Sequence, residues 1–510
     1  MDARNISEAL DYGHCHRHLD PPAEGETGRA PDAGELQLTD RRNIPRLSSV
    51  PPGEPAVVSR RALLGAAAAG AGGLVLGGWG LSSTARRARG VLPGTVLAAA
   101  AVRQPGSLPN PALPPGTASL PEIENIIVVM MENHSFDNIL GMLGRGDTFA
   151  KGPDGKPTAA CPDGKGNLVH AFHMPSECMT SGVSNSWNTG HGSYDNGTNQ
   201  GFVTSSTGES MGYFTGDDIP FTWGLASTFP IADRWFCSAM AQTDPNRRYL
   251  ISGTSLGLIN DTFPTALPPN GTIFDSLNRY GITWKDYYSD LPSIGTYLPL
   301  LTKAGISDKL VKMEEFYKDA ASGKLPQFSL LEPNYGNQSQ ENPQDIQFGD
   351  QYLSDVVQAV LHGPKWSKTL MIWTYDEWGG WYDHVPPPAA IAPDDIPPDL
   401  PPGFMPGGFD LYGFRVPAGV ISPYARRDFV SHAVYDHTSV LKTVETKWNL
   451  PALTRRDANA RDVFEMIDLK AAPAFLTPPK LPDPANPAGS YTCLATGPGP
   501  IPPASAVRPA

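Results

Sequence analysis

Short apolar runs alternate with amphipathic segments along the middle of the chain. Ile126–Met130 is an unbroken apolar run, and the mainly apolar stretches Thr369–Thr374 and Phe414–Ser422 predict a second and a third strand. Such runs are typical of strands that are buried on both faces of a parallel sheet. Ile346–His362 instead repeats its apolar residues along one side, as an amphipathic helix does. The alternation predicts an α/β fold with a mainly parallel central sheet flanked by helices.

The same patterns predict the remaining elements. The predicted strands are Ile123–Met131, Thr283–Tyr288 and Pro326–Leu331, and Ile231–Cys237 reads as a strand or a helix end. The predicted helices are Ser135–Leu143, Phe221–Thr228, Asn246–Ser255, Thr272–Tyr280, Val311–Ser322 and Thr438–Trp448. Residues 181–216 are rich in Ser, Asn, Gly, Thr, Trp and Tyr and have no period. They predict a long structureless loop, which in a compact domain is usually functional.

Changes of composition divide the chain into five segments. Residues 1–56 are polar and without a period, which indicates disorder or an overlong N-terminal extension. Residues 57–102 contain a signal-like region, and residues 103–121 form a Pro-rich linker. Residues 122–470 are expected to form the folded domain, and residues 471–510 a Pro-rich tail.

The signal-like region contains Arg60-Arg61, followed by a weakly hydrophobic, Ala/Gly-rich run that ends near Leu81. This pattern resembles a twin-arginine export signal, with a single N-terminal membrane anchor as the alternative. We therefore expect the twin-arginine translocation machinery as a partner, and a secreted or cell-envelope location. This route exports proteins that are already folded, which suits an enzyme that needs a metal or cofactor.

Charge and cysteine content exclude some classes of protein. The net charge is −13, with 39 basic and 52 acidic residues, and no basic tract follows the signal region. A nucleic-acid partner is therefore not expected. The five cysteines form no CxxC pair. If Cys15 is removed with a leader, the other four allow one or two disulfides, with isolated buried thiols as an equal alternative.

Polar side chains follow two of the predicted buried strands at the point where each strand ends. Glu132 and Asn133 follow the first strand, and Asp376 and Glu377 follow the strand Thr369–Thr374. Ligands bind at this edge of open α/β sheets, and neighbouring buried carboxylates are costly unless a cation shares their charge. The two pairs predict an oxygen-rich metal cage. The alternative is a simple strand-to-helix turn with Asn133 or Ser135 as the N-cap.

Two further stretches carry candidate chemistry. Thr243 precedes Asp244-Pro245-Asn246, a turn-forming run that should open a helix. A hydroxyl at a helix N-terminus lies in a positive potential that favours attack on an anionic phosphate, but an ordinary helix cap has the same pattern. His437 precedes another predicted helix. It could orient a carboxylate, bind metal or contact phosphate, or stand beside a capping Asp436 or Thr438.

Four motifs in order carry a resemblance to a known family: MMENHSFDN, AQTDPNRRYL, TYDEWGGWYDHVPPP and YDHTSVLKTVE. From about Glu122 to Pro451 the chain resembles the bacterial phospholipase C and acid phosphatase family of phosphoesterases, which includes plant non-specific phospholipases C. The resemblance implies an alkaline-phosphatase-like α/β fold. It also implies hydrolysis of phosphate esters by a metal-bound hydroxyl nucleophile, so that residues 122–470 would be a phosphoesterase catalytic domain.

The resemblance assigns roles to particular residues. It implies Glu132, Asn133, Asp376 and Glu377 as metal ligands, Thr243 as the metal-bound nucleophile and His191 as the group that protonates the leaving oxygen. We expect Asn342, His384 and His437 to contact the substrate. Asn342 and Asn185 stand where members of the family often carry His. An amide can hydrogen-bond phosphate but cannot give up a proton, so these replacements leave fewer acid groups at the site.

The predicted function is an exported, metal-dependent phosphoesterase with a Thr nucleophile. The favoured type is a phospholipase C that releases a phosphorylated head group from phospholipid. The alternatives are an acid phosphatase-type phosphomonoesterase and a non-catalytic binding protein on the same fold. No Cys-x-Pro-x-Arg motif of the sulfatase type occurs. Oxygen ligands suit a divalent Ca, Mg or Mn ion, with Zn and Fe as further options.

Aromatic residues accompany the motifs and suggest how a lipid head group could be held. They are Trp187, Tyr194, Trp378, Trp381 and Tyr382. Such rings could cage choline through cation–π contacts, or they could simply pack the walls of the site. A phospholipid substrate also implies a transient contact with the membrane surface.

Overall fold

The computed structural model describes residues 102–180, 182–487, 493 and 497–505. The predicted N-terminal extension and all but the last residue of the twin-arginine region lie outside the described residues. Within the described part, no helix is both long and apolar enough to cross a membrane.

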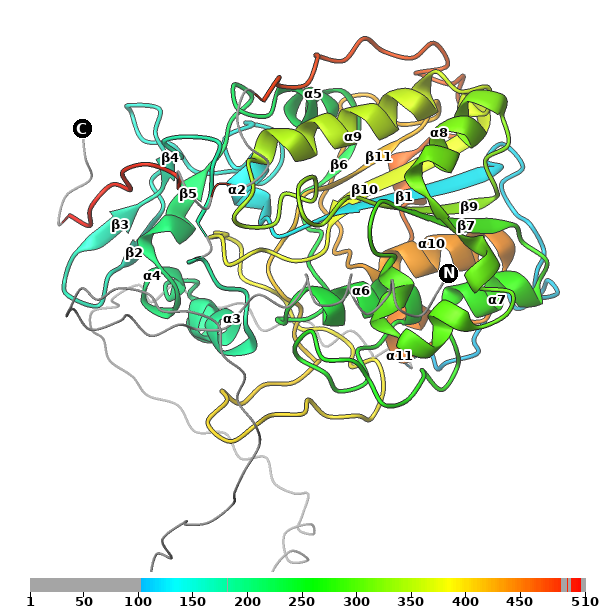
Figure 1. Ribbon diagram of the computed structural model, residues 1–510, viewed down its shortest axis with the longest axis horizontal. Helices are drawn as coiled ribbons and strands as arrows, with labels where there is room; N and C mark the ends of the chain where they lie inside the picture. The colour runs from blue at the N-terminus through cyan, green and yellow to red at the C-terminus, as the bar shows by residue number, and fades with distance from the viewer. Residues whose placement is uncertain (1–101, 181, 488–492, 494–496, 506–510) are drawn as a thin grey trace, which may run out of the picture. The chain divides into compact units, whose positions relative to one another are not determined.

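The centre of the molecule is a mainly parallel sheet, as the apolar runs predicted (Figure 1). Its strand order is β12-β6-β11-β10-β1-β9-β7-β8. The bounds are β1 Asn125–Met131, β6 Ile231–Ala232, β7 Trp284–Tyr288, β8 Leu310–Lys312, β9 Phe328–Glu332, β10 Thr369–Tyr375, β11 Ala418–Ile421 and β12 Val430–Ser431. β11 runs antiparallel to both of its neighbours, and the other pairings are parallel.

Helices cover both faces of this sheet (Figure 1). On one side lie α5 Pro220–Thr228, α8 Met313–Ser322 and α9 Ile346–Leu361. On the other side lie α6 Thr243–Ser252, α7 Ile273–Arg279, α10 Thr438–Trp448 and α11 Arg455–Asn459. The α9 residues that the pattern placed on one side are buried, which confirms that face of the helix.

Strand β1 sets the position of the predicted site. All of its residues are buried, and its neighbours β10 and β9 run parallel to it. Met131 is paired with Tyr375, and the Asp376 N–H donates to the Met131 carbonyl at 3.1 Å. The residues that follow the two strands therefore leave the sheet side by side, because parallel strands end at the same edge.

The expected loop at residues 181–216 is wrong. This stretch contains the helices α3 Trp187–Tyr194 and α4 Phe202–Ser205, and the strand β5 Gly212–Tyr213, which pairs with β4 Phe172–His173. Strands β2 Ala160–Pro162 and β3 Leu168–His170 form a further hairpin nearby, and α2 Phe136–Leu140 follows β1. The polar composition hid α3, because contacts with the rest of the fold stabilise it rather than an apolar stripe of its own.

Close packing explains one of the glycines of α3. A Cβ atom at Gly190 would lie 2.7 Å from the Met240 side chain and 2.9 Å from that of Trp378. Glycine costs helix stability, but here it lets α3 approach the segment just before α6.

Another correction concerns the predicted helix Val311–Ser322. Its first residues extend β8 along the sheet edge, and α8 begins at Met313.

The Pro-rich segments at both ends of the domain pack against it. Ser119 donates its N–H to the Lys447 carbonyl at 2.7 Å, and Asn110 donates to the Asn449 side chain at 2.9 Å. In the tail, Cys493 forms a disulfide with Cys178, and its N–H donates to the Pro343 carbonyl at 2.8 Å. Cys161 and Cys237 are buried thiols. Within the described residues, the cysteines therefore form one disulfide and leave two buried thiols, which combines the two alternatives drawn from the sequence.

Candidate active site

The two polar pairs that follow β1 and β10 meet at the edge of the sheet. Asp376 accepts a hydrogen bond from the Asn133 N–H at 3.1 Å and from the Glu377 N–H at 2.7 Å. Asn133 has a positive φ of 65°, a conformation that Asn tolerates better than most residues. A Cβ atom at Gly379 would lie 1.8 Å from the Asn133 carbonyl oxygen, so only glycine fits there. The backbone thus brings Asn133 and Asp376 into direct contact.

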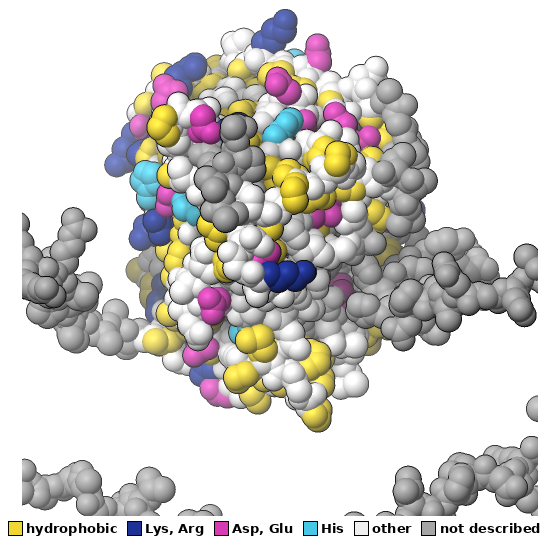
Figure 2. Space-filling model, turned by 90° about the vertical axis from the view of Figure 1, so that its left-hand side faces the viewer, with side chains coloured by type: hydrophobic (Ala, Val, Ile, Leu, Met, Phe, Trp, Pro, Cys, Tyr) yellow, Lys and Arg dark blue, Asp and Glu magenta, His cyan; other side chains and the backbone are white. Residues whose placement is uncertain are grey.

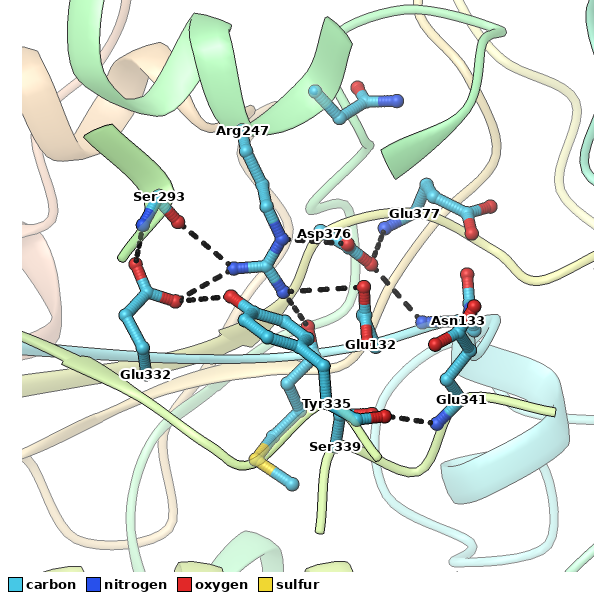
Figure 3. A network of polar contacts seen from close by, with 12 residues as sticks. Glu132, Asn133, Arg247, Ser293, Glu332, Tyr335, Ser339, Glu341, Asp376 and Glu377 are labelled. Atoms are coloured by element: carbon cyan, nitrogen blue, oxygen red, sulfur yellow. Dashed lines mark hydrogen bonds and ion pairs between the residues drawn. The ribbon is translucent and has the colours of Figure 1, made fainter. Parts of the chain in front are cut away.

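Arg247 of α6 joins these strand ends from the opposite side (Figure 3). Its Nε lies 3.2 Å from Asp376 Oδ2, and its Nη2 lies 3.9 Å from Glu132 Oε1. The Arg247 side chain is only 2% exposed, so the guanidinium is a buried counter-charge for both carboxylates. Sequence reasoning did not single out Arg247, although it lies inside the motif that contains Thr243.

A third strand end holds the other side of the guanidinium. Glu332, the last residue of β9, accepts from Arg247 Nη1 at 2.9 Å and from the Tyr335 hydroxyl at 2.7 Å. Ser293 also accepts from Arg247, at 3.1 Å. Sequence reasoning missed Glu332, although the strand-end rule that found Glu132 would have found it, because a carboxylate also ends the strand Pro326–Leu331.

The carboxylates at the edge are buried and raise one another's pKa. Burial, then the charge of Asp376, holds the pKa of Glu377 well above its usual value. Burial, then Glu341 and Asp376, does the same to the pKa of Glu132. Burial raises the pKa of Asp376 to about 6, although Arg247 opposes the shift. The cluster has more negative charge than Arg247 alone compensates.

A second acidic group borders the first and was not predicted. The Asp244 N–H donates to Asp261 at 2.8 Å. Burial and the charge of Asp261 raise the pKa of Asp244 to about 7 and that of Glu341 to about 8. The charge of Asp261 also raises the pKa values of Asp376 and Glu377, so the two acidic groups interact electrostatically. No pattern in the sequence around Asp261 marks it.

Thr243 is the first residue inside α6, and Gln242 is the N-cap. Thr243 is therefore not the N-cap of α6, and the alternative of an ordinary helix cap is wrong. Thr243 and Arg247 are separated by one helical turn and lie on the same face, with side chains about 5–6 Å apart at Cβ. Since Arg247 contacts Glu132 and Asp376, Thr243 lies on the helix face that points to the acidic cluster.

Asn246 fixes the segment that leads into α6. Its side-chain amide donates to the carbonyls of Ala239 and Ala241 at 3.2 and 2.9 Å, and its Oδ1 accepts from the Ala239 N–H at 3.0 Å. Asn246 is fully buried. These contacts hold the chain in one conformation immediately before Thr243.

Of the two amides that the resemblance placed at positions of family His residues, Asn185 contacts the strand ends. Asn185 donates to Glu377 Oε1 at 2.6 Å and to Asn133 Oδ1 at 3.3 Å, so it bridges the two strand ends. Asn342 has a buried Oδ1 without a hydrogen-bond partner among the described residues. A ligand that donates a hydrogen bond would satisfy this oxygen.

His191 lies on α3, whose Gly190 packs against the segment before α6. Its Nδ1 lies 2.9 Å from the Trp187 carbonyl, which can only accept, so Nδ1 holds the proton and Nε2 has the free lone pair. Burial lowers the pKa of His191 below its usual value. The resting imidazole is therefore neutral and must take up a proton before it can donate one.

The contacts of His437 give no support for the expected substrate contact. The side chain is fully buried, and Nε2 lies 2.5 Å from the Asp376 carbonyl oxygen. Trp235 donates to its Nδ1 at 3.4 Å. With both nitrogens engaged beneath the site, His437 orients the Asp376 strand end, which was the first of the roles considered for it. Burial lowers the pKa of His437 to about 4, so it is neutral.

His384 belongs to a separate ionic network around Arg415. His384 Nδ1 lies 2.7 Å from Asp137, and Arg415 pairs with Asp137 at 3.0 Å and with Asp383 at 2.9 Å. Asp137, Asp383 and His384 offer ligand atoms within 4.8 Å of one another, so they form an acidic/His group that could hold a metal. Arg415 already neutralises both carboxylates, which makes this group a weaker candidate than the strand-end cluster. The contacts of His384 give no support for a role at the substrate.

Most of the aromatic side chains near the motifs are buried against other side chains and are not accessible to a ligand. Trp187, Trp378, Trp381 and Tyr382 are buried. Trp381 stacks on the His134 ring at 5.9 Å, and Trp378 packs on Phe414 at 5.2 Å. The expected choline cage is therefore not formed by these four rings, and the alternative, packed walls, holds for them.

The Arg415 network predicts a pH dependence of stability. Burial alone would lower the pKa of His384, but the hydrogen bond to Asp137 and the charges of Asp137 and Asp383 outweigh it and raise the pKa to about 9. A raised folded-state pKa adds stability below pH 6.5 that is lost as pH rises through about 9. We expect His384→Gln to destabilise the protein at pH 6 and much less at pH 9.5. Thermal melting of both proteins across this range checks it; an equal difference at both pH values would contradict it.

The chain belongs to the phosphoesterase family, whose model matches residues 123–451. This confirms the resemblance drawn from the four motifs. The protein is a hydrolase that acts on phosphate ester bonds.

Curated relatives narrow the class further. Non-specific phospholipase C1 of Arabidopsis thaliana is 30% identical over 398 residues, which cover 71% of this chain and 74% of the relative. Phospholipase C B of Mycobacterium tuberculosis is 29% identical over 423 residues, which cover 70% and 80%. The protein is therefore a phospholipase C-like phosphoesterase.

Among solved structures, this chain is similar over part of its length to a protein of the alkaline phosphatase superfamily from Vibrio parahaemolyticus. It is 10% identical, with a TM-score of 0.37, and the match covers 69% of this chain and 72% of that one. This overlap is too partial to support a statement about the chemistry.

Proposed function

We propose that the protein is an exported, metal-dependent phospholipase C that uses Thr243 as its nucleophile. The observation that carries the proposal is the position of Thr243. Its helix face also carries Arg247, whose guanidinium contacts the carboxylates that end β1 and β10. The relatives named as phospholipases C support the reaction class.

The strand-end cluster fits a divalent cation. Glu132 Oε2 is buried and has no hydrogen-bond partner among the described residues. Asn133, Asp376 and Glu377 supply further oxygens, and burial together with the charges of neighbouring carboxylates raises the pKa of Glu132, Asp376 and Glu377, an effect that a bound cation would oppose. Oxygen-only donors of this kind suit a hard cation such as Ca²⁺, Mg²⁺ or Mn²⁺. When bound, the ion would lower the pKa of a nearby hydroxyl and offset charge on phosphate oxygens.

The residues of the chain divide the reaction into two displacements. Thr243 loses its hydroxyl proton and its Oγ1 forms a bond to phosphorus, while the bond from phosphorus to the diacylglycerol oxygen breaks. The proton that Thr243 loses goes to solvent, and the neutral His191 takes up a proton from solvent at Nε2 before it passes this proton to the leaving oxygen. Water then attacks the phosphothreonine, and the phosphorylated head group leaves with the Thr243 hydroxyl restored. Asn246 keeps Thr243 in place, and Asn342 offers an oxygen to a donor group of the substrate.

The metal proposal predicts the behaviour of Asp376→Asn. The change keeps the shape of the side chain but removes a negative charge from the cluster. We expect at least a tenfold weaker affinity for the divalent ion. Elemental analysis after dialysis, and the rise of melting temperature with added metal, measure this affinity. Asp308→Asn, in a 3₁₀ turn away from the cluster, is a suitable control. Equal metal content in Asp376→Asn and wild type would count against the ligand role.

The substrate class is tested by direct comparison. The enzyme is expected to release phosphocholine and diacylglycerol from phosphatidylcholine faster than it hydrolyses a simple phosphate monoester. Preference for the monoester would instead assign it to the acid phosphatase type. Failure to hydrolyse either ester and to bind any divalent metal would favour a binding protein on the same fold.

Export by the twin-arginine route is supported by the disulfide Cys178–Cys493, because disulfides persist in oxidising compartments outside the cytoplasm. Replacing Arg60 and Arg61 with Lys is expected to retain the protein in the cytoplasm. Fractionation of cells that express each form measures the distribution. Unchanged export of the double variant would remove the twin-arginine assignment.

A further inference from the structure

A long loop between β10 and β11 carries an exposed apolar tip. Ala389 and Leu411 form a bridge at its base, where the Ala390 N–H also donates to the Asp410 carbonyl at 2.7 Å. At its far end, residues 401–407 (PPGFMPG), called here the apolar tip, are all exposed and uncharged. Phe404 is 36% exposed and Met405 40% exposed. Large apolar side chains rarely gather in the open unless they meet a partner.

The apolar tip is held in one conformation by the rest of the protein. The Trp187 indole N–H donates to the Met405 carbonyl at 2.8 Å, and the Met405 N–H donates to Asn188 Oδ1 at 2.8 Å. The Phe404 N–H donates to the Pro401 carbonyl at 3.1 Å. Trp187 and Asn188 both belong to α3. Since the backbone is fixed, the exposed parts of Phe404 and Met405 stay open to solvent. The sulfur of Met405 lies against α3, because a Cβ atom at Gly192 would be 3.9 Å from it.

The apolar tip is connected to the helices of the active site. A Cβ atom at Gly407 would lie 2.3 Å from His191 Nε2, so the end of the tip lies against the proposed proton donor. Phe409, just past the tip, is buried against Trp187 at 6.0 Å and against Tyr249 of α6 at 6.2 Å. The tip therefore lies beside the two helices that carry His191 and Thr243.

The charge around the apolar tip limits the partner that it fits. Residues 386–413 contain no Lys or Arg, and their charged residues are Asp394, Asp395, Asp399 and Asp410. An acidic loop repels the anionic lipids and acidic proteins that basic patches attract. Hydrophobic side chains gather at the lower end of the face in Figure 2, which corresponds to the lower part of Figure 1 where this loop lies. An apolar tip without basic residues fits a lipid layer whose interior is apolar and whose head groups carry no net charge.

We propose that the apolar tip inserts Phe404 and Met405 into a zwitterionic phospholipid surface and brings the active site to its substrate there. This inference rests on the proposed phospholipase C function. Insertion removes the exposed parts of these two apolar side chains from water, which favours binding. The tip adjoins His191, so a lipid whose head group enters the site can keep its acyl chains in the membrane.

The test separates surface binding from chemistry. Binding is measured by sedimentation with phosphatidylcholine vesicles, in a Thr243→Ala background that leaves the lipid intact. F404S/M405S is expected to bind at least about tenfold more weakly than its parent. The control L113S/L476S alters two exposed leucines elsewhere, 39% and 54% exposed, and is expected to bind as its parent does. Added phosphatidylglycerol is expected to weaken binding.

Activity supplies the second readout. With Thr243 intact, F404S/M405S is expected to hydrolyse a monomeric short-chain phosphatidylcholine at the wild-type rate and vesicles at least about tenfold more slowly. No vesicle binding by the parent protein, equal losses in both double variants, or binding only to anionic vesicles would overturn the inference. Vesicle binding that depends on the tip, without hydrolysis of any phosphodiester, would instead refute the proposed function.

Discussion

Thr243→Ala is expected to lower kcat on the best phosphate ester by at least about three orders of magnitude. The change removes the oxygen that would form the bond to phosphorus. Folding should be little affected, because Thr243 is the first residue of α6 and not its N-cap, so no capping hydrogen bond is lost. The melting temperature is therefore expected to stay close to that of the wild type.

A matched pair of variants separates the hydroxyl from the side-chain shape. Thr243→Ser keeps the hydroxyl and is expected to retain activity within about tenfold, whereas Thr243→Val keeps the branched shape and should be as inactive as Thr243→Ala. With phosphatidylcholine as substrate, mass spectrometry of acid-quenched wild-type enzyme should detect phosphocholine bound to Thr243. Full activity in Thr243→Val would remove the nucleophile assignment, whatever the state of the metal.

Arg247→Met is expected to destabilise the protein by about 3–5 kcal/mol, because it leaves buried carboxylates without their counter-charge. Arg247 contacts Asp376, Glu132 and Glu332, which end three neighbouring strands. Without the guanidinium, repulsion among these groups acts against the folded state. The destabilisation should shrink as pH falls, because protonation removes the unpaired charges. Chemical denaturation at pH 5 and pH 8 measures both effects.

Two controls give this prediction its specificity. Arg455 pairs with Asp395 at 2.8 Å, but Asp395 is 93% exposed, so Arg455→Met is expected to cost at most about 1 kcal/mol. Arg247→Lys keeps the charge and loses the forked geometry, so it should fall between wild type and Arg247→Met. If Arg247→Met were as stable as Arg455→Met, the guanidinium could not be the group that holds the strand ends together.

Local patterns predicted the elements that carry the site. The apolar run of β1 and the polar pair Glu132–Asn133 after it identified both the central strand and the edge where ligands gather. The turn-forming run after Thr243 predicted a helix start close to that residue, although α6 begins at Thr243 itself and not at Asn246. These features succeed because strand burial, helix initiation and strand-end polarity depend on residues that are adjacent in sequence.

Other features depended on contacts between distant segments. The helix α3 has no apolar stripe, and it is stable because Gly190 lets it pack closely on Met240 and Trp378. The positions of the two His residues that were expected to contact the substrate also depend on distant segments. His437 is buried beneath Asp376 and His384 is paired with Asp137, and neither burial nor partner can be read from the flanking residues.

The sequence by itself determined the fold class, the family and the residues that the chain offers for phosphate ester chemistry. Its apolar periods and short motifs are local, and family membership is carried by those motifs in order. Only the tertiary structure decided how the charges balance. Arg247 and Glu332 are far apart in sequence from Glu132, yet the fold brings all three into one polar network (Figure 3). The charge of Asp261 also acts on Asp376 and Glu377 of this network. The strand-end pair Glu132–Asn133 is thus one part of a buried ionic cluster, because an isolated buried carboxylate would be too costly to keep.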